Sequence, residues 1–304
     1  MTRKDLLKNL TVPQGPVDCV IDTDAYNEID DQYAIALLVK SKKLHVIDFY
    51  AAPFFNANST SPADGMERSF DEIKHLLTLM GRQELCDNVY RGSTTYLPDE
   101  ATFVESPAAR RLCRLAASYS PERPLYVVAI GCITNVASAL LMDPSIKDKI
   151  VLVWLGGHAT DWPNTAEFNM VQDIAAARVV MGCGCPLVQL PCMGVVSAFY
   201  ATEPELNYWL KGKNTLCDYL VEHTVEAAEK YAKGRVWSRV IWDVTAVAWL
   251  LNDGDRFMWG KVVPAPIPTY DKRYAFNGRR HPIFQVRHIN RDALMNELFR
   301  VLAE

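Results

Sequence analysis

The sequence lacks the features that would direct it to a membrane or to nucleic acid. Its most apolar runs are short and interrupted, and none approaches the roughly 20 residues that a transmembrane helix needs. Lys and Arg number 32 against 36 for Asp and Glu, so the net charge is −4 and there is no basic footprint for nucleic acid. Residues 1–10 carry charges on both sides of an apolar patch that is too short for a signal peptide. We therefore expect neither a membrane nor a nucleic acid as partner.

The eight cysteines lack the spacing of a disulfide or zinc framework. They are scattered and mostly flanked by apolar residues, and Cys183 and Cys185 form a lone pair without a second pair at zinc-ligand spacing. Scattered cysteines with apolar neighbours are typically buried free thiols of a protein in a reducing compartment. We expect a cytoplasmic protein.

What the sequence does contain is a regular alternation of strand-like and helix-like segments. This alternation predicts an α/β fold with an open, doubly wound, mostly parallel sheet and helices on both faces. With no linker or repeat, residues 1–304 are predicted as one domain with a helical C-terminal insertion, although a helical subdomain over 200–255 is an alternative. The predicted strands span residues 17–21, 44–52, 88–91, 124–130, 150–155, 187–190 and 283–288, and the predicted helices include 32–40, 61–80, 106–118, one capped by Thr134 and Asn135, 174–181 and 291–303.

The most informative stretch runs from Asp22 to Asp31. It follows an apolar, β-branched strand and precedes a helix, so its four aspartates occupy a strand-to-helix turn, where open α/β sheets bind ligands. Carboxylates this close repel one another unless a cation or a shared proton intervenes, and hard oxygen ligands favour Ca²⁺ or Mg²⁺. The helix dipole alone would explain Asp30 or Asp31. It would not explain Asp22 and Asp24, which alternate out of the strand.

Further polar groups follow the other predicted strands. Asn56 and Asn58 come after the second strand, Ile130 to Asn135 close the third, Glu167 and Asn169 lie in the loop after the fourth, and Trp242 and Asp243 open a late helix. Individually each has an ordinary explanation, since Asn is a turn former and Asp243 is a plain N-cap candidate. Together, their places beyond strand ends predict that they converge on one cleft.

With these motifs assembled, the chain from about residue 17 to the C-terminus resembles the nucleoside hydrolase family, the calcium-dependent N-ribohydrolases of the inosine-uridine type. The motifs that carry the resemblance are Asp-x-Asp followed by Asp-Asp, the Asn after the second strand, a Gly-x-x-Thr-Asn turn, Ala-Glu-Phe-Asn at 166–169, and the late Asp243. The resemblance implies hydrolysis of the N-glycosidic bond of a ribonucleoside or related ribosyl compound. It also implies bound Ca²⁺ and a role in purine or pyrimidine salvage, and we further expect a homo-oligomer, a dimer or a tetramer.

By position, the resemblance assigns roles to particular residues. Asp24 is similar to the general base, and Asp24, Asp31, the Ile130 carbonyl and Asp243 are similar to the calcium ligands. The residues similar to the groups that hold the ribose hydroxyls are Asp30, Asn56, Glu167 and Asn169. This set suits the chemistry, because glycosidic cleavage through an oxocarbenium-like state needs negative charge, a positioned water and help for the leaving group.

The sequence departs from the family pattern in three places, one of which is the absence of the His-rich loop near the base site from the matching stretch Ser93 to Pro107. Five residues, Ala25 to Ile29, separate Asp-x-Asp from Asp-Asp where the family has fewer, so Tyr26, Asn27 and Glu28 are candidates to enter the pocket. The His that serves as leaving-group acid is Trp242 here, which we expect to stack on the leaving group. Further stacking candidates are Trp154, Trp162 and Phe55, and His158 is an alternative acid. The ordinary explanations are a core tryptophan and a loop histidine.

Two other functions compete with this assignment. A haloacid-dehalogenase-type phosphatase also opens with Asp-x-Asp after a strand, but it needs a late acidic pair, and Gly254-Asp255 follows a predicted helix instead of a strand. The second competing function is that of a calcium-dependent nucleoside- or sugar-binding protein with little or no turnover, because Trp242 replaces the family's leaving-group histidine.

Overall fold

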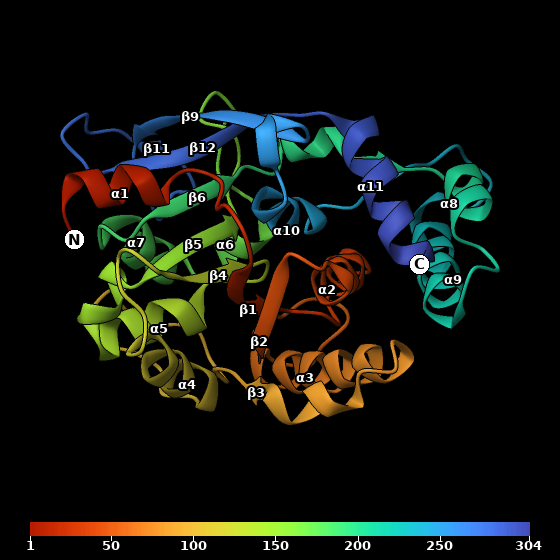
Figure 1. Ribbon diagram of the computed structural model, residues 1–304, viewed down its shortest axis with the longest axis horizontal. Coiled ribbons are helices and arrows are strands. Elements are labelled where there is room, and N and C mark those ends of the chain that lie inside the picture. Colours follow the sequence, from red (N-terminus) through yellow and green to blue (C-terminus); the bar gives the residue numbers. More distant parts are fainter.

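The computed structural model describes residues 1–304 as a sheet with helices packed on both faces (Figure 1). The eight-stranded sheet has the order β3-β2-β1-β4-β5-β6-β12-β9, and every pairing is parallel except that of the edge strand β9 with β12. Its strands are β1 (Val17–Thr23), β2 (Leu44–Ala51), β3 (Val89–Arg91), β4 (Leu125–Ala129), β5 (Ile150–Leu155), β6 (Leu187–Leu190), β9 (Met258–Pro264) and β12 (Pro282–Ile289). The predicted fold class is confirmed.

The helices form a layer on each side of the sheet. Helices α2, α3, α10 and α11 cover one face, and α4, α5 and α7 cover the other, while α8 and α9 lie beyond α11 and α3 near the C-terminus (Figure 1). Their bounds are α1 (Arg3–Asn9), α2 (Asp30–Lys40), α3 (Pro62–Leu79), α4 (Pro107–Ala116), α5 (Thr134–Met142), α6 (Phe168–Gln172), α7 (Ile174–Gly182), α8 (Glu203–Trp209), α9 (Thr215–Ala232), α10 (Val244–Leu250) and α11 (Arg291–Ala303). None of these helices has the length and apolar character needed to cross a membrane.

Four short strands form two small antiparallel ribbons. Strand β7 (Tyr200–Ala201) pairs with β8 (Arg239–Val240), and β10 (Ile267–Pro268) pairs with β11 (Tyr274–Ala275). The first ribbon matters for the site because β8 ends just before α10.

The core consists of two apolar layers, one on each face of the sheet. The central strands β4 and β5 are buried along their whole length, as expected for parallel strands covered on both sides. All eight cysteines are free thiols, and five of them are buried.

The chain order of the strands fixes where a ligand can bind. The chain runs from β1 outward to β2 and β3, then returns to the other side of β1 and runs outward through β4, β5 and β6. The order therefore reverses between β1 and β4, and a crevice forms beyond the carboxyl ends of these two strands.

The structure corrects two local expectations. Thr134 and Asn135 do not cap a helix. They are the first two residues of α5, and their side chains donate hydrogen bonds to Asp173 and Asp22. Phe168 and Asn169 do not lie in a loop but open the short helix α6, because the Glu167 carboxylate accepts the backbone N–H groups of Asn169 and Met170.

Candidate active site

One cavity of about 510 Å³ beyond the carboxyl ends of β1, β4 and β5 is lined by Trp242 and by every residue to which the resemblance assigns a role. These are Asp24, Asp30, Asp31, Asn56, Ile130, Glu167, Asn169, Trp242 and Asp243. The predicted convergence of the strand-end motifs on one cleft is therefore found.

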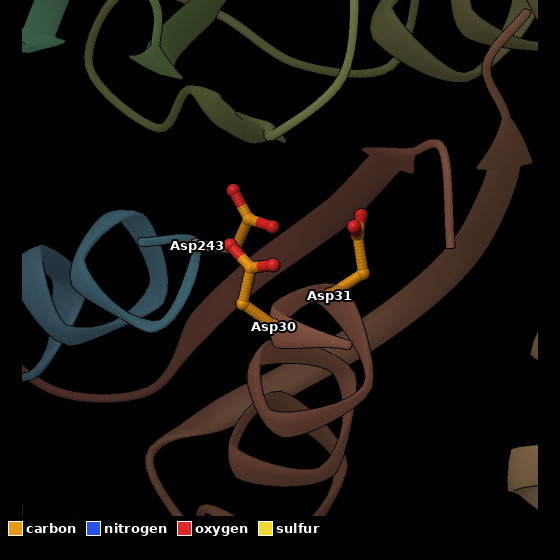
Figure 2. A group of neighbouring side chains, drawn as sticks. All are labelled: Asp30, Asp31 and Asp243. Atoms are coloured by element: carbon orange, nitrogen blue, oxygen red, sulfur yellow. The ribbon is translucent and has the colours of Figure 1, made fainter. Parts of the chain in front are cut away.

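Three carboxylates cluster on one wall of this cavity (Figure 2). Asp30 and Asp31 project from the first turn of α2, and Asp243 projects from the start of α10. Each offers a carboxylate oxygen, and these oxygens all lie within 4.8 Å of one another. Asp243 occupies the N-cap position of α10, yet its side chain makes no capping hydrogen bond. Its carboxylate is therefore available to a ligand in the cavity.

Asp24 approaches the same cavity from the end of β1. Its side chain lies against the turn after β4, where a Cβ on Gly131 would come within 3.0 Å of the Asp24 Oδ1. The other carboxylate oxygen, Oδ2, is buried and has no hydrogen-bond partner. Burial and the neighbouring charge of Asp31 raise the pKa of Asp24 well above its usual range.

Asp31 and Asp243 also have raised pKa values. Burial, followed by the nearby Asp30, raises the pKa values of Asp31 and Asp243 well above normal, although Thr23 donates a hydrogen bond of 2.5 Å to Asp31. Groups of this kind are stabilised by protons or by a cation, and a buried all-oxygen donor set suits a hard divalent ion. The residues present therefore fit a metal ion.

Asn169 fixes the turn that carries the Ile130 carbonyl. Its Nδ2 donates hydrogen bonds to the carbonyl oxygens of Ile130 at 2.8 Å and Leu155 at 3.2 Å. The Oδ1 of Asn169 accepts no hydrogen bond within the chain. A carbonyl oxygen has two lone pairs, so the Ile130 oxygen retains one for a second partner.

Glu167 holds the loop between β5 and α6 rigidly. Its carboxylate accepts backbone N–H groups from Gly157, Asn169 and Met170 at 2.8–2.9 Å. Burial raises the pKa of Glu167, and these three donors oppose that rise. Oε2 accepts two of these donors, from Gly157 and Met170, whereas Oε1 accepts only the Asn169 N–H and keeps one lone pair for a further donor.

The long turn between Asp24 and Asp30 is tied to the loop after β2. Asn56 donates to the side chain of Asn27 at 2.5 Å, and Asn58 donates to the Asn27 carbonyl at 2.8 Å. Asn27 and Glu28 line the cavity, whereas Tyr26 is exposed outside it. Two of the three residues proposed to enter the pocket from this turn do so.

Arg239, on β8, is a cavity residue that the sequence did not reveal. Its guanidinium forms ion pairs with Glu28 and, at 3.5 Å, with Asp30, and its side chain is only 13% exposed. Its Nε is buried and has no hydrogen-bond partner. Partners more than 200 residues apart leave no local sequence signal.

The aromatic candidates divide between the cavity and the core. Trp242 is half-buried, lines the cavity and packs against the apolar core, so it has features of both interpretations. Trp154 is completely buried on β5, which rules it out as a stacking residue in the cavity, and Phe55 and Trp162 are exposed side chains that do not line it. His158 lines the cavity, and its Nδ1 accepts the Met193 N–H at 3.2 Å, which places the proton of the neutral ring on Nε2. Burial lowers the pKa of His158 and favours this neutral form.

Known proteins share both the sequence pattern and the fold. Residues 19–294 match the sequence model of the family described as inosine-uridine preferring nucleoside hydrolase. The pyrimidine-specific ribonucleoside hydrolase RihA of Escherichia coli O81 (strain ED1a) is 27% identical over 256 residues, covering 73% of this chain and 76% of the relative.

Solved structures agree with that match at the level of the fold. A plant nucleoside hydrolase, PpNRh1, superposes with a TM-score of 0.73 at 19% identity over 95% of this chain and 99% of its own. The purine-preferring ribonucleoside hydrolase from Gardnerella vaginalis superposes with a TM-score of 0.74 at 18% identity, covering 94% and 98%. The match over nearly the whole length confirms the resemblance read from the motifs: the chain belongs to the inosine-uridine preferring nucleoside hydrolase family.

Proposed function

We propose that this protein hydrolyses the N-glycosidic bond of a ribonucleoside or closely related ribosyl compound, with Asp24 as general base and Ca²⁺ as cofactor. The observation that carries the proposal is the set of buried carboxylates of Asp24, Asp31 and Asp243, gathered from distant segments at the switch point of the sheet. Family membership supports the reaction class, and the relatives' names support ribonucleosides as substrates.

The residues proposed to hold Ca²⁺ are Asp24, Asp31, Asp243 and the carbonyl of Ile130. When bound, Ca²⁺ would supply coordination positions for a water and two vicinal hydroxyls, and would lower the pKa of that water. The partnerless Oδ2 of Asp24 can accept the proton of the attacking water.

The remaining polar residues orient the sugar. We assign Asp30, Asn56, Glu167 and Asn169 to the ribose hydroxyls, because they line the cavity around the acids. Each of them is already held by a partner, namely Arg239 for Asp30, Asn27 for Asn56, backbone N–H groups for Glu167 and the Ile130 carbonyl for Asn169. Fixing these side chains before substrate binds reduces the entropy lost in reaching a reactive geometry. Trp242 is proposed to stack on the leaving group. We also propose a single domain, a homo-oligomer and a cytoplasmic, salvage-type role.

Release of free ribose from a panel of ribonucleosides, with Ca²⁺ and with a chelator, tests the proposal. We expect Ca²⁺-dependent ribose release, and we expect Asp24→Asn to reduce kcat about 10²–10⁴-fold, the usual contribution of a general base. Asp253→Asn, at a half-exposed site paired with Lys43, is the matched control and should retain the wild-type rate.

Two outcomes would contradict parts of this proposal. An Asp24→Asn variant with more than about a tenth of the wild-type rate would remove Asp24 from the role of general base. Saturable, Ca²⁺-dependent nucleoside binding without any ribose release would instead identify a binding protein, an alternative that the replacement of the family's histidine by Trp242 keeps open.

A further inference from the structure

Arg239 is the one Lys or Arg side chain in a cavity that six acidic residues line. Two of those acids, Glu28 and Asp30, pair with it and hold the guanidinium in place. The buried Nε–H has no acceptor, which leaves a charged hydrogen-bond donor unsatisfied. A buried donor without a partner is costly, and such a group in a cavity is explained when a ligand supplies the acceptor.

Arg239 comes from the same segment as Trp242, the residue proposed to stack on the leaving group. It lies on β8, three residues before Trp242, in the segment that leads into α10. The groups assigned to the sugar, apart from Asp30, come from other segments, the loops after β2 and β5. Arg239 and Trp242 therefore reach the cavity from a different segment than Asn56, Glu167 and Asn169, and Arg239 contacts the ribose set only through Asp30.

The cavity also continues past Arg239. A second cavity of about 430 Å³ shares Asn27, Glu28 and Arg239 with the first and extends along α9 to Tyr219 and Tyr231. The Glu28–Arg239 pair thus stands between the two spaces. A heterocycle bonded to ribose at the cluster of acids has room to extend towards this pair.

We propose that Arg239 binds the leaving group and stabilises the negative charge that develops on it, for substrates whose heterocycle presents a carbonyl oxygen or ring nitrogen as acceptor. This rests on the proposed function. As the C1′–N bond breaks, its electron pair stays on the heterocycle, and the water oxygen bonds to C1′ while its proton passes to Asp24. Arg239 keeps its own proton and donates a hydrogen bond to the departing anion, which later takes a proton from solvent. A guanidinium is suited to this because it stays charged and presents several donors in a fixed plane.

The test compares substrates that differ in their need for leaving-group stabilisation. In Arg239→Gln, we expect kcat/KM for inosine and uridine to fall about 10²–10³-fold, the usual loss of one preorganised donor, and that for 4-nitrophenyl riboside to fall less than about tenfold. Nitrophenolate is stable as an anion and needs little help. Equal losses on all three substrates would overturn the proposal.

Two companion variants separate this role from simple neutralisation of Glu28 and Asp30. Glu28→Gln keeps the guanidinium and should preserve the preference pattern of the wild type. If Arg239 only balances charge, the double variant Glu28→Gln/Arg239→Gln should regain wild-type activity on inosine, which would overturn the proposal. We expect it to remain about 10²-fold or more impaired. Calorimetry with Ca²⁺ confirms that each variant retains its metal site.

A binding measurement tests the contact independently of turnover. Free hypoxanthine should bind Arg239→Gln about tenfold or more weakly than wild type, the loss expected for one charge-assisted hydrogen bond. Equal affinities would overturn the contact. If wild type cleaves no riboside with Ca²⁺ but shows this difference in affinity, the proposed hydrolysis fails while the assignment of Arg239 to the heterocycle stands.

Discussion

At the scale of single residues, removal of the Asp31 or Asp243 carboxylate should lower the affinity for a metal ion most strongly. Both are buried in the shared cluster, and neither has an arginine or lysine partner. We expect Asp31→Ala or Asp243→Ala to abolish tight Ca²⁺ binding in calorimetry, because each removes a charged ligand. Asp253→Ala, at the half-exposed control site, should bind as wild type does. Unchanged affinity in both cluster variants would contradict the assigned metal site.

Trp242 stands between the cavity and the core, so its replacement distinguishes two roles. If it stacks on the leaving group, Trp242→Ala should lose about 1–3 kcal/mol of transition-state stabilisation, as for aromatic–base stacking elsewhere. Trp242→His should raise activity on inosine, since an imidazolium can donate a proton. Steady-state kinetics and thermal melting, measured side by side, check both. A lower Tm with an unchanged rate per folded molecule would identify a core residue only.

Residue identities could be predicted where the signal is local. Asp24 and Asp31 lie within one turn, and their alternation after an apolar strand marks them without any three-dimensional knowledge. Arg239 could not be found in this way, because its partners Glu28 and Asp30 lie on another element and only the fold joins them.

At the scale of elements, the start of α5 ties together the strand ends that frame the site. The Asn135 amide donates to Asp22 at 2.7 Å and to the Ala51 carbonyl at 3.2 Å, and its oxygen accepts the Ser93 N–H at 2.7 Å. The last residues of β1 and β2 and the segment after β3 thus meet at one buried side chain.

Removing this side chain should destabilise the protein. Asn135→Ala leaves several buried polar groups without partners, at about 1–3 kcal/mol each, so we expect a loss of about 2–5 kcal/mol in the free energy of unfolding by denaturant titration. Asn277→Ala, at an exposed position, is the control and should stay within about 0.5 kcal/mol. A loss below about 1 kcal/mol for Asn135→Ala would show that these strand ends are held by other contacts.

The elements that could be predicted are those with a strong pattern of their own. Strands β5 and β6 match their predicted bounds because their largely apolar runs are sharply delimited, β5 by Lys149 and Gly156 and β6 by Pro186 and Pro191. Strand β9 was not predicted, because it is an edge strand with exposed residues such as Trp259 and Val262 and a terminal proline. Its existence depends on pairing with β12, which no local pattern encodes.

At the scale of the whole molecule, we expect the buried acids to make stability depend on pH and on the proposed Ca²⁺ together. Burial raises the pKa of Asp22 to about 7, and the pKa values of Asp24, Asp31 and Asp243 are also raised. A carboxyl whose pKa is higher in the folded state than in the unfolded state stabilises the folded protein fully below about pH 4, the pKa of the unfolded state. This stabilisation is lost as the pH rises through the pKa of the folded state. With a chelator present, we therefore expect Tm to fall between pH 5 and pH 8.

Calcium should reverse the sign of this dependence, because it binds the deprotonated carboxylates. At a hundredfold excess over the dissociation constant it adds about 2.7 kcal/mol, or about 4 °C in Tm, at pH 8, and less at pH 5. Thermal melts at both pH values, with Ca²⁺ and with a chelator, measure this. A Ca²⁺-induced rise in Tm as large at pH 5 as at pH 8 would contradict the assignment of titrating carboxylates as ligands.

The cluster of Asp30, Asp31 and Asp243 joins a helix from the first part of the chain to one from the last part. No short stretch of the unfolded polypeptide contains all three carboxylates. Ca²⁺ can therefore bind to them only after folding has brought α2 and α10 together across the long segment that separates them in the chain. In stopped-flow experiments Ca²⁺ should therefore leave the rate of refolding nearly unchanged and slow unfolding. Ca²⁺ would bind after the transition state of folding, so it would lengthen the lifetime of the native protein without accelerating its formation.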